Sequence, residues 1–142
     1  MKRHAFSLIT LLGLLLVAGS AIGQTIRVHA DVPFDFVVGN KTLPAGMYDV
    51  KSISDRDSTD LLVQAQDGHS SIMALTNSAE NFKPADKTKL VFKKYRDQYF
   101  LAEIWTAGSI RGRRLPKSNR EKELELAQDL QHQRVEIVAS LY

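Results

Sequence analysis

Hydrophobic and polar side chains alternate in short segments along most of this 142-residue chain, and a period of two is typical of β-strands. Turn-forming residues separate the segments, as at Gly39-Asn40, Leu43-Pro44-Ala45-Gly46 and Asp67-Gly68. The expected strands are residues 24–31, 34–38, 47–53, 61–66, 71–76, the two halves of 90–105, and 135–142. This pattern predicts a mainly β fold: a single antiparallel β sandwich, roll or open barrel of about seven or eight strands.

The stretch from Leu90 to Trp105 is the densest in aromatic residues, and we interpret it as the central hairpin. Arg96-Asp97 is the natural place for the chain to reverse. Leu90 and Phe92 share one face, whereas Val91 and Tyr95 share the other. Because both faces carry apolar side chains, we expect the hairpin to lie inside the sheet rather than at an edge.

The pattern changes near the C-terminus, where apolar residues recur at helical spacing. Ser118 and Glu121 form a capping box, which predicts a helix over residues 119–132 that packs over one end of the sheet. Its charged residues, Glu121 among them, are expected on the solvent side. The segments 77–87 and 106–116 lack strand periodicity, and we expect both to be loops.

Residues 1–23 have a basic start, a short apolar run and small residues at the exit, which together indicate a secretory signal peptide. The run is too short to span a bilayer as a stable helix. Cleavage after Gly23 would leave residues 24–142 as one β-rich domain, with 17 basic and 16 acidic residues. A near-neutral domain gives no reason to expect nucleic acid as a partner. We therefore expect an exported protein, periplasmic or extracellular, with no transmembrane segment after cleavage.

No group of residues in the sequence indicates a catalytic or metal-binding site. There is no cysteine, so no disulfide can form, and no G-x-S-x-G motif is present. His29, His69 and His132 are widely separated, and the acidic stretch 55–60 lacks the glycine and glutamate of a calcium loop. We therefore predict no catalytic residue, no metal and no cofactor.

Clusters of basic residues are the best candidates for binding. Arg111, Arg113, Arg114 and Lys117 lie close together in a glycine-containing segment, where they could hold an anionic group. The alternative is an apolar ligand inside a barrel, lined by Tyr95, Tyr99 and Trp105.

Three stretches carry a family resemblance: DVPFDFVVGNKTLPAGMYDV (31–50), KTKLVFKKYRDQYFLAEIWTAG (87–108) and RRLPKSNREKEL (113–124). Together they resemble a group of short secreted bacterial proteins of unknown function. Members often carry Gly-Asp in the hairpin turn where this chain has Arg96-Asp97, and that departure leaves the turn type open. The resemblance implies export and one β-rich domain, but it implies no activity, cofactor or site residues.

We expect an exported, non-catalytic β domain with a binding or structural role in the cell envelope. The expected partner is an anionic envelope polymer or another envelope protein. The first alternative is a small-molecule carrier with a barrel cavity, and the second is a small hydrolase. A filled interior would argue against the carrier, whereas a converging polar cluster in a cleft would favour the enzyme.

Overall fold

The computed structural model describes residues 25–54, 59–128 and 132–142. The signal peptide predicted for residues 1–23 and most of the acidic stretch 55–60 lie outside these residues, as does part of the helix predicted for 119–132. Within the described part, no helix is long and apolar enough to cross a membrane.

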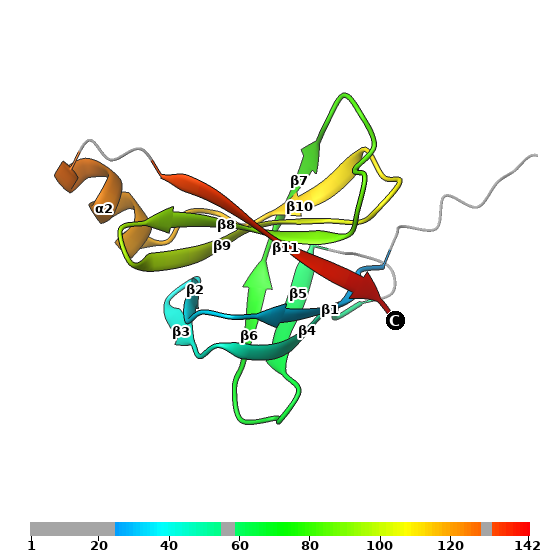
Figure 1. Ribbon diagram of the computed structural model, residues 1–142, viewed down its shortest axis with the longest axis horizontal. Helices are drawn as coiled ribbons and strands as arrows, with labels where there is room; N and C mark the ends of the chain where they lie inside the picture. The colour runs from blue at the N-terminus through cyan, green and yellow to red at the C-terminus, as the bar shows by residue number, and fades with distance from the viewer. Residues whose placement is uncertain (1–24, 55–58, 129–131) are drawn as a thin grey trace, which may run out of the picture.

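Eleven strands and one helix are present in the described residues (Figure 1). They are β1 (Arg27–Val32), β2 (Phe36–Val38), β3 (Lys41–Leu43), β4 (Gly46–Ser52), β5 (Asp60–Ala65), β6 (Ser71–Leu75), β7 (Asn77–Glu80), β8 (Lys89–Tyr95), β9 (Gln98–Trp105), β10 (Arg111–Arg114), α2 (Asn119–Gln128) and β11 (Gln133–Leu141). The mainly β fold, with one late helix followed by a last strand, is as the sequence predicts.

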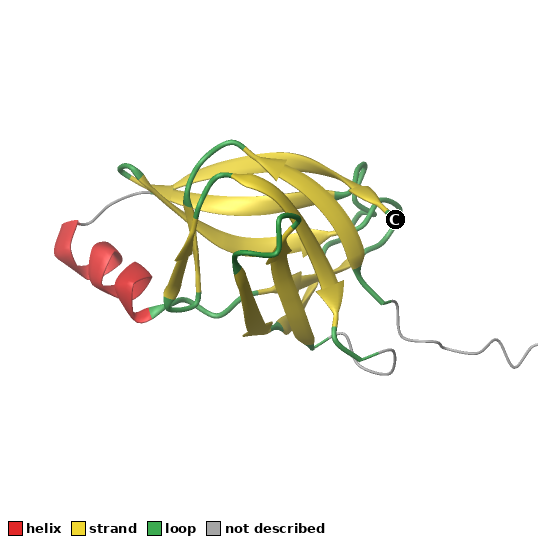
Figure 2. Ribbon diagram, turned by 90° about the horizontal axis from the view of Figure 1, so that it is seen from below, coloured by secondary structure: helices red, strands yellow, loops and turns green. Residues whose placement is uncertain are grey.

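The strands form one strongly curved sheet in the order β3-β2-β9-β8-β11-β1-β4-β5-β6. β10 pairs with the far half of β9 and also with β7. Because β7 follows β6 after a single residue, the β7–β10 ladder links the two ends of the sheet. The result is a nearly closed, barrel-like sheet, whose curvature is visible in Figure 2.

Two predicted loops contain strands, which corrects the sequence interpretation. Segment 77–87 includes β7 and segment 106–116 includes β10, and these two strands pair with each other in the register Arg111↔Glu80 to Arg114↔Asn77. Both strands are four residues long and mostly polar, so neither has the apolar alternation from which strands are recognised. The three-residue β3 was missed for the same reason.

The barrel interior is filled by apolar side chains from nearly every strand. Buried residues that meet in this main core include Val28, Val32, Phe36, Leu43, Tyr48, Val50, Leu61, Val63, Leu90, Phe92, Leu101 and Ile104. Phe34, Tyr99, Val135 and Ile137 are partly buried and pack against it. The interior is therefore a packed core.

The β8–β9 hairpin is buried on both faces, as predicted. Leu90 and Phe92 enter the main core, whereas Val91 and Tyr95 point outward into two separate apolar clusters. One outer cluster joins Tyr95, Phe100 and Val37, and Leu124 of α2 covers it. The helix thus packs over the turn end of the hairpin (Figures 1 and 2).

The second outer cluster contains Trp105, Val91 and Ala79, with Ala85 packed against it. Gly112 of β10 lies directly against the Trp105 ring. A Cβ at this position would fall 2.6 Å from Trp105 Cε3 and 2.7 Å from the Ile104 carbonyl oxygen. Only glycine lets β10 pair with β9 over this indole.

The hairpin turns at Arg96-Asp97, and Arg96 has a φ of 54°. No other non-glycine residue in the described part has positive φ. Positive φ at only the first central residue belongs to a type II′ turn, in which glycine is the preferred first residue. The turn position was predicted correctly, and the turn type left open by the sequence is therefore II′.

We expect the Arg96→Gly variant to be more stable than the wild type by about 0.5–1 kcal/mol. Glycine removes the steric cost of positive φ, although the greater freedom of the unfolded chain offsets part of that gain. Chemical denaturation of both proteins would measure the change. Asp97→Gly is the matched control: the φ of Asp97 is not positive, so this variant should lose stability.

Candidate functional site

β10 places its arginines on two faces. The Gly112 side of the strand is turned to Trp105, and alternation along a strand puts Arg111 and Arg113 on the opposite side. Arg114 shares the Gly112 side. The three arginines of the predicted anion site therefore divide between two faces, and Lys117 lies beyond the strand.

Arg111 and Arg113 line a depression of about 370 Å³ where β7 and β10 meet the start of β1. The other lining residues are Ile26, Ser78, Ser109, Ile110 and Gly112. Its lining is therefore mixed: apolar at Ile26 and Ile110, hydroxyl-bearing at two serines, and cationic at two arginines. Such a surface suits a partly solvated anionic group.

Arg113 is fixed in position by a buried threonine. Its Nε donates to Thr76 Oγ1 at 2.8 Å and its Nη2 donates to the Thr76 carbonyl at 2.7 Å, while Thr76 is 2% exposed. A guanidinium has five N–H donors, so three remain beyond these two bonds. Arg111 is less constrained than Arg113, because 74% of its side chain is exposed. Its Nε meets the carboxylate of Glu80, which is also exposed, at 3.2 Å.

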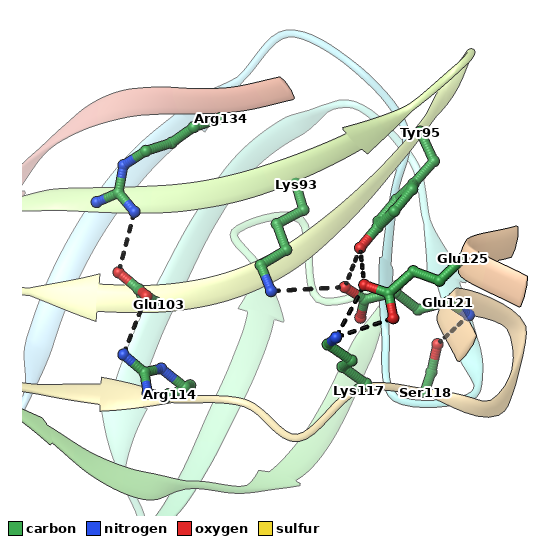
Figure 3. Close-up of polar contacts among 9 residues, drawn as sticks. All are labelled: Lys93, Tyr95, Glu103, Arg114, Lys117, Ser118, Glu121, Glu125 and Arg134. Carbon is green, nitrogen blue, oxygen red and sulfur yellow. Dashed lines mark hydrogen bonds and ion pairs between the residues drawn. The ribbon is translucent and has the colours of Figure 1, made fainter. Parts of the chain in front are cut away.

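Arg114, on the other face, belongs to a network around Glu103. Glu103 lies between Arg114 (3.5 Å) and Arg134 (3.4 Å), as Figure 3 shows, and it accepts a hydrogen bond from Trp105 Nε1 at 2.8 Å. Only 13% of the Glu103 side chain is exposed. The network joins β9, β10 and β11 across the outer surface, so Arg114 has a structural partner.

Lys117 contributes to a second network that holds α2 against the barrel (Figure 3). Its Nζ lies 2.8 Å from both carboxylate oxygens of Glu125. The Tyr95 hydroxyl lies 2.8 Å from Glu125 Oε1 and 3.0 Å from Glu121 Oε1. Lys93 Nζ is 3.9 Å from Glu121. Two carboxylates and two cations thus surround one buried phenol.

Glu121 is 5% exposed, which corrects its expected place on the solvent side of the helix. Its backbone N–H donates to Ser118 Oγ at 3.2 Å, as the capping box predicts. Its carboxylate meets Tyr95 and Lys93 instead of water. The spacing of charged residues along the helix could not reveal this contact, because both partners of Glu121 come from β8.

The pKa values in this network follow from its contacts. The hydrogen bond from Lys117 holds the pKa of Glu125 below its ordinary value, and the bond from Tyr95 acts in the same direction. The bond to Glu125 raises the pKa of Lys117. Burial, reinforced by the two carboxylates, raises the pKa of Tyr95 far above its usual range. An ionised Glu125 and a protonated Tyr95 phenol therefore favour the docked helix.

Tyr95, Tyr99 and Trp105 do not line a common cavity in the described residues. Tyr95 lies under α2, and Trp105 lies in the other outer cluster. Tyr99 stacks on Phe34 with ring centroids 3.7 Å apart, and Lys94 Nζ lies 5.3 Å from the Tyr99 ring centre. Each ring already has its packing partners.

One polar cluster was not anticipated from the sequence. His29 and Asp49 are opposite each other on β1 and β4, and His29 Nδ1 contacts Asp49 Oδ1. Gln66 Nε2 lies 3.1 Å from Asp49 Oδ1, while Tyr142 stacks on the imidazole at 3.8 Å. Only the strand register could have revealed this contact. The cluster lies on the outer face of the sheet, and no group of three or more described His, Cys, Asp or Glu side chains could hold a metal ion.

No protein-family model, curated protein or solved structure matches this chain.

The Glu125 contacts predict an acid-sensitive helix. Because the folded-state pKa of Glu125 lies below its ordinary value of 4.5, the unfolded chain binds more protons as pH falls. The stability that Glu125 contributes should be complete above pH 4.5 and disappear as pH falls through the folded-state pKa. Denaturation of wild type and Glu125→Gln from pH 7 to pH 3 would measure it. The two curves should converge at low pH, and a constant difference would contradict the prediction.

Proposed function

We propose that this protein is an exported, non-catalytic β domain that binds an anionic polymer of the cell envelope through the depression beside β10. The observation that carries the proposal is the pairing of Arg111 and Arg113 on one face of a strand, over a hollow with two serine hydroxyls. Arg113 is preorganised by Thr76, which lowers the entropic cost of binding.

The proposal narrows the site expected from the sequence. Arg114 and Lys117 pair with Glu103 and Glu125, whose side chains are only 13% and 29% exposed. Arg111 also meets a carboxylate, but both Arg111 and Glu80 are well exposed, and Arg113 bonds to Thr76 instead of a carboxylate. A sulfate, phosphate or carboxylate group on a polymer would meet the free guanidinium N–H groups. A carrier role receives less support, because the three aromatic residues expected to line a cavity are packed elsewhere.

Retention on immobilised heparin, a sulfated polysaccharide, tests the site. We expect the wild-type protein to remain bound above about 0.3 M salt, where non-specific surface attraction is strongly screened. Arg111→Ser with Arg113→Ser should weaken binding by about tenfold or more, because charge-assisted hydrogen bonds are lost. Arg114→Ser with Lys117→Ser is the matched control and should change retention little.

Loss of Arg113 also removes its bonds to Thr76, so the thermal stability of the double variant must be measured beside binding. Ser78→Glu provides a second route, since it adds a negative charge to the depression without touching Thr76. It should abolish retention above 0.3 M salt. Equal retention of wild type, Ser78→Glu and the double variant would overturn the proposed site.

Export is part of the same proposal and has its own test. The basic start and short apolar run of residues 1–23 support cleavage after Gly23. Mass spectrometry of protein recovered from the periplasm or medium of an expressing bacterium should therefore find a mature chain that begins at Gln24. Recovery of the chain with Met1 still present would contradict export by cleavage.

A further inference from the structure

β6 is the terminal strand of the sheet path and pairs with β5 on one side only. At one end Ala65 N–H donates to the Ser70 carbonyl, and at the other Thr76 N–H donates to the Thr59 carbonyl. Even-numbered residues of this segment therefore bond to β5. Since backbone groups alternate in direction, the N–H and C=O groups of Ser71, Met73 and Leu75 point to the opposite edge.

One contact supports this assignment. Lys41 Nζ donates to the Ser71 carbonyl at 2.9 Å, from the side away from β5. Beyond Ser71, no described strand pairs with the Met73 and Leu75 edge. The N–H and C=O groups of Met73 and Leu75 are therefore able to form hydrogen bonds with a second extended chain.

A groove of about 310 Å³ runs along this edge. Its lining residues are Gly39, Asn40, Ile72, Met73, Ala74, Leu75, Leu115 and Pro116. The far wall cannot pair with β6, because Pro116 has no N–H and the Leu115 N–H donates to the Ala102 carbonyl at 2.8 Å. The groove thus has one hydrogen-bonding wall and one apolar wall.

The outer side of the edge is strongly apolar. Met73 is 70% exposed and Leu75 is 69% exposed, and the half-exposed Ile53 lies beside them in a neighbouring depression. An extended segment along β6 would cover part of this surface while its alternate side chains entered the groove against Ile72 and Ala74. Backbone and side-chain complementarity therefore favour the same occupant.

The two ends of the edge carry opposite charges. Lys41 lies at the Ser71 end and meets a carbonyl rather than a carboxylate. Asp60 lies opposite Leu75 on β5, and its carboxylate has no ion-pair partner among the described residues. Ser71 and Leu75 are four residues apart, or about 13 Å in a strand. A complementary segment therefore has a basic and an acidic residue at this spacing.

We propose that the β6 edge binds an extended peptide segment, antiparallel to β6, with a basic residue opposite Leu75 and an acidic residue opposite Ser71. The two residues next to these charges are apolar and enter the groove. This function is independent of the anion site beside β10. The protein's own Leu115 and Pro116 line the far wall of the groove, and the proposed occupant is a single extended segment rather than the edge of a second barrel.

The probe is a labelled peptide, acetyl-Thr-Arg-Val-Thr-Val-Glu-Thr-amide, titrated with the full mature protein in fluorescence polarisation. In the proposed register, the central Thr N–H bonds to the Met73 carbonyl. Methylation of that nitrogen should abolish binding, whereas methylation of the preceding Val nitrogen, which points away from β6, should be tolerated. Equal effects of the two methyl groups would overturn edge pairing.

Charge exchange tests the orientation. Swapping Arg and Glu in the peptide should weaken binding by about tenfold, because two attractions become repulsions. The Lys41→Glu with Asp60→Lys protein should reverse this preference, and both substitutions are at exposed sites that leave β5–β6 pairing intact. Absence of peptide binding, stronger binding of the swapped peptide to wild type, or a wild-type dimer that blocks the peptide would each overturn the proposal.

Discussion

Burial of the β8–β9 hairpin on both faces is the constraint on which the rest of the structure depends. A two-stranded unit with apolar side chains on each side needs cover inside and outside the barrel. The main core covers Leu90 and Phe92, whereas α2 and the β7–β10 region cover Tyr95 and Trp105. The late helix, the ladder that links the sheet ends and the glycine at 112 all serve this one requirement.

The outer surface follows from the same arrangement. Basic residues that are neighbours in sequence become separated because successive side chains of β10 point to opposite faces. Carboxylates from distant segments form ion pairs with most of these basic residues. Glu103 forms ion pairs with Arg114 and Arg134, and Glu125 forms an ion pair with Lys117. Single exposed ion pairs contribute little to stability, but these networks fix side chains that join several strands. Arg113 differs from these residues, because it bonds to Thr76 rather than to a carboxylate.

The sequence was sufficient for elements whose signal is local. The hairpin turn at Arg96-Asp97 and the helix start at Ser118 each depend on residues that are close together in the chain. β7 and β10 could not be predicted in this way, because their only reason to be extended is that they pair with each other. The prediction that Glu121 faces solvent was wrong for the same physical reason, because Tyr95, which buries it, is distant in the sequence. Nor could composition separate Arg113 from Arg114, which differ only in the face that strand register gives them.

The pairing of β1 with β11 has a consequence for how the molecule forms. Val28, His29 and Ala30 lie opposite Leu141, Ser140 and Ala139, so the first and last strands are neighbours in space. A chain that emerges N-terminus first therefore shows an open β1 edge until residues near 140 arrive. Pairing of β11 with β1 and β8 must therefore follow the arrival of residues 133–141. Until that step, the growing chain has an unpaired strand edge that a chaperone could occupy and that β11 later takes over.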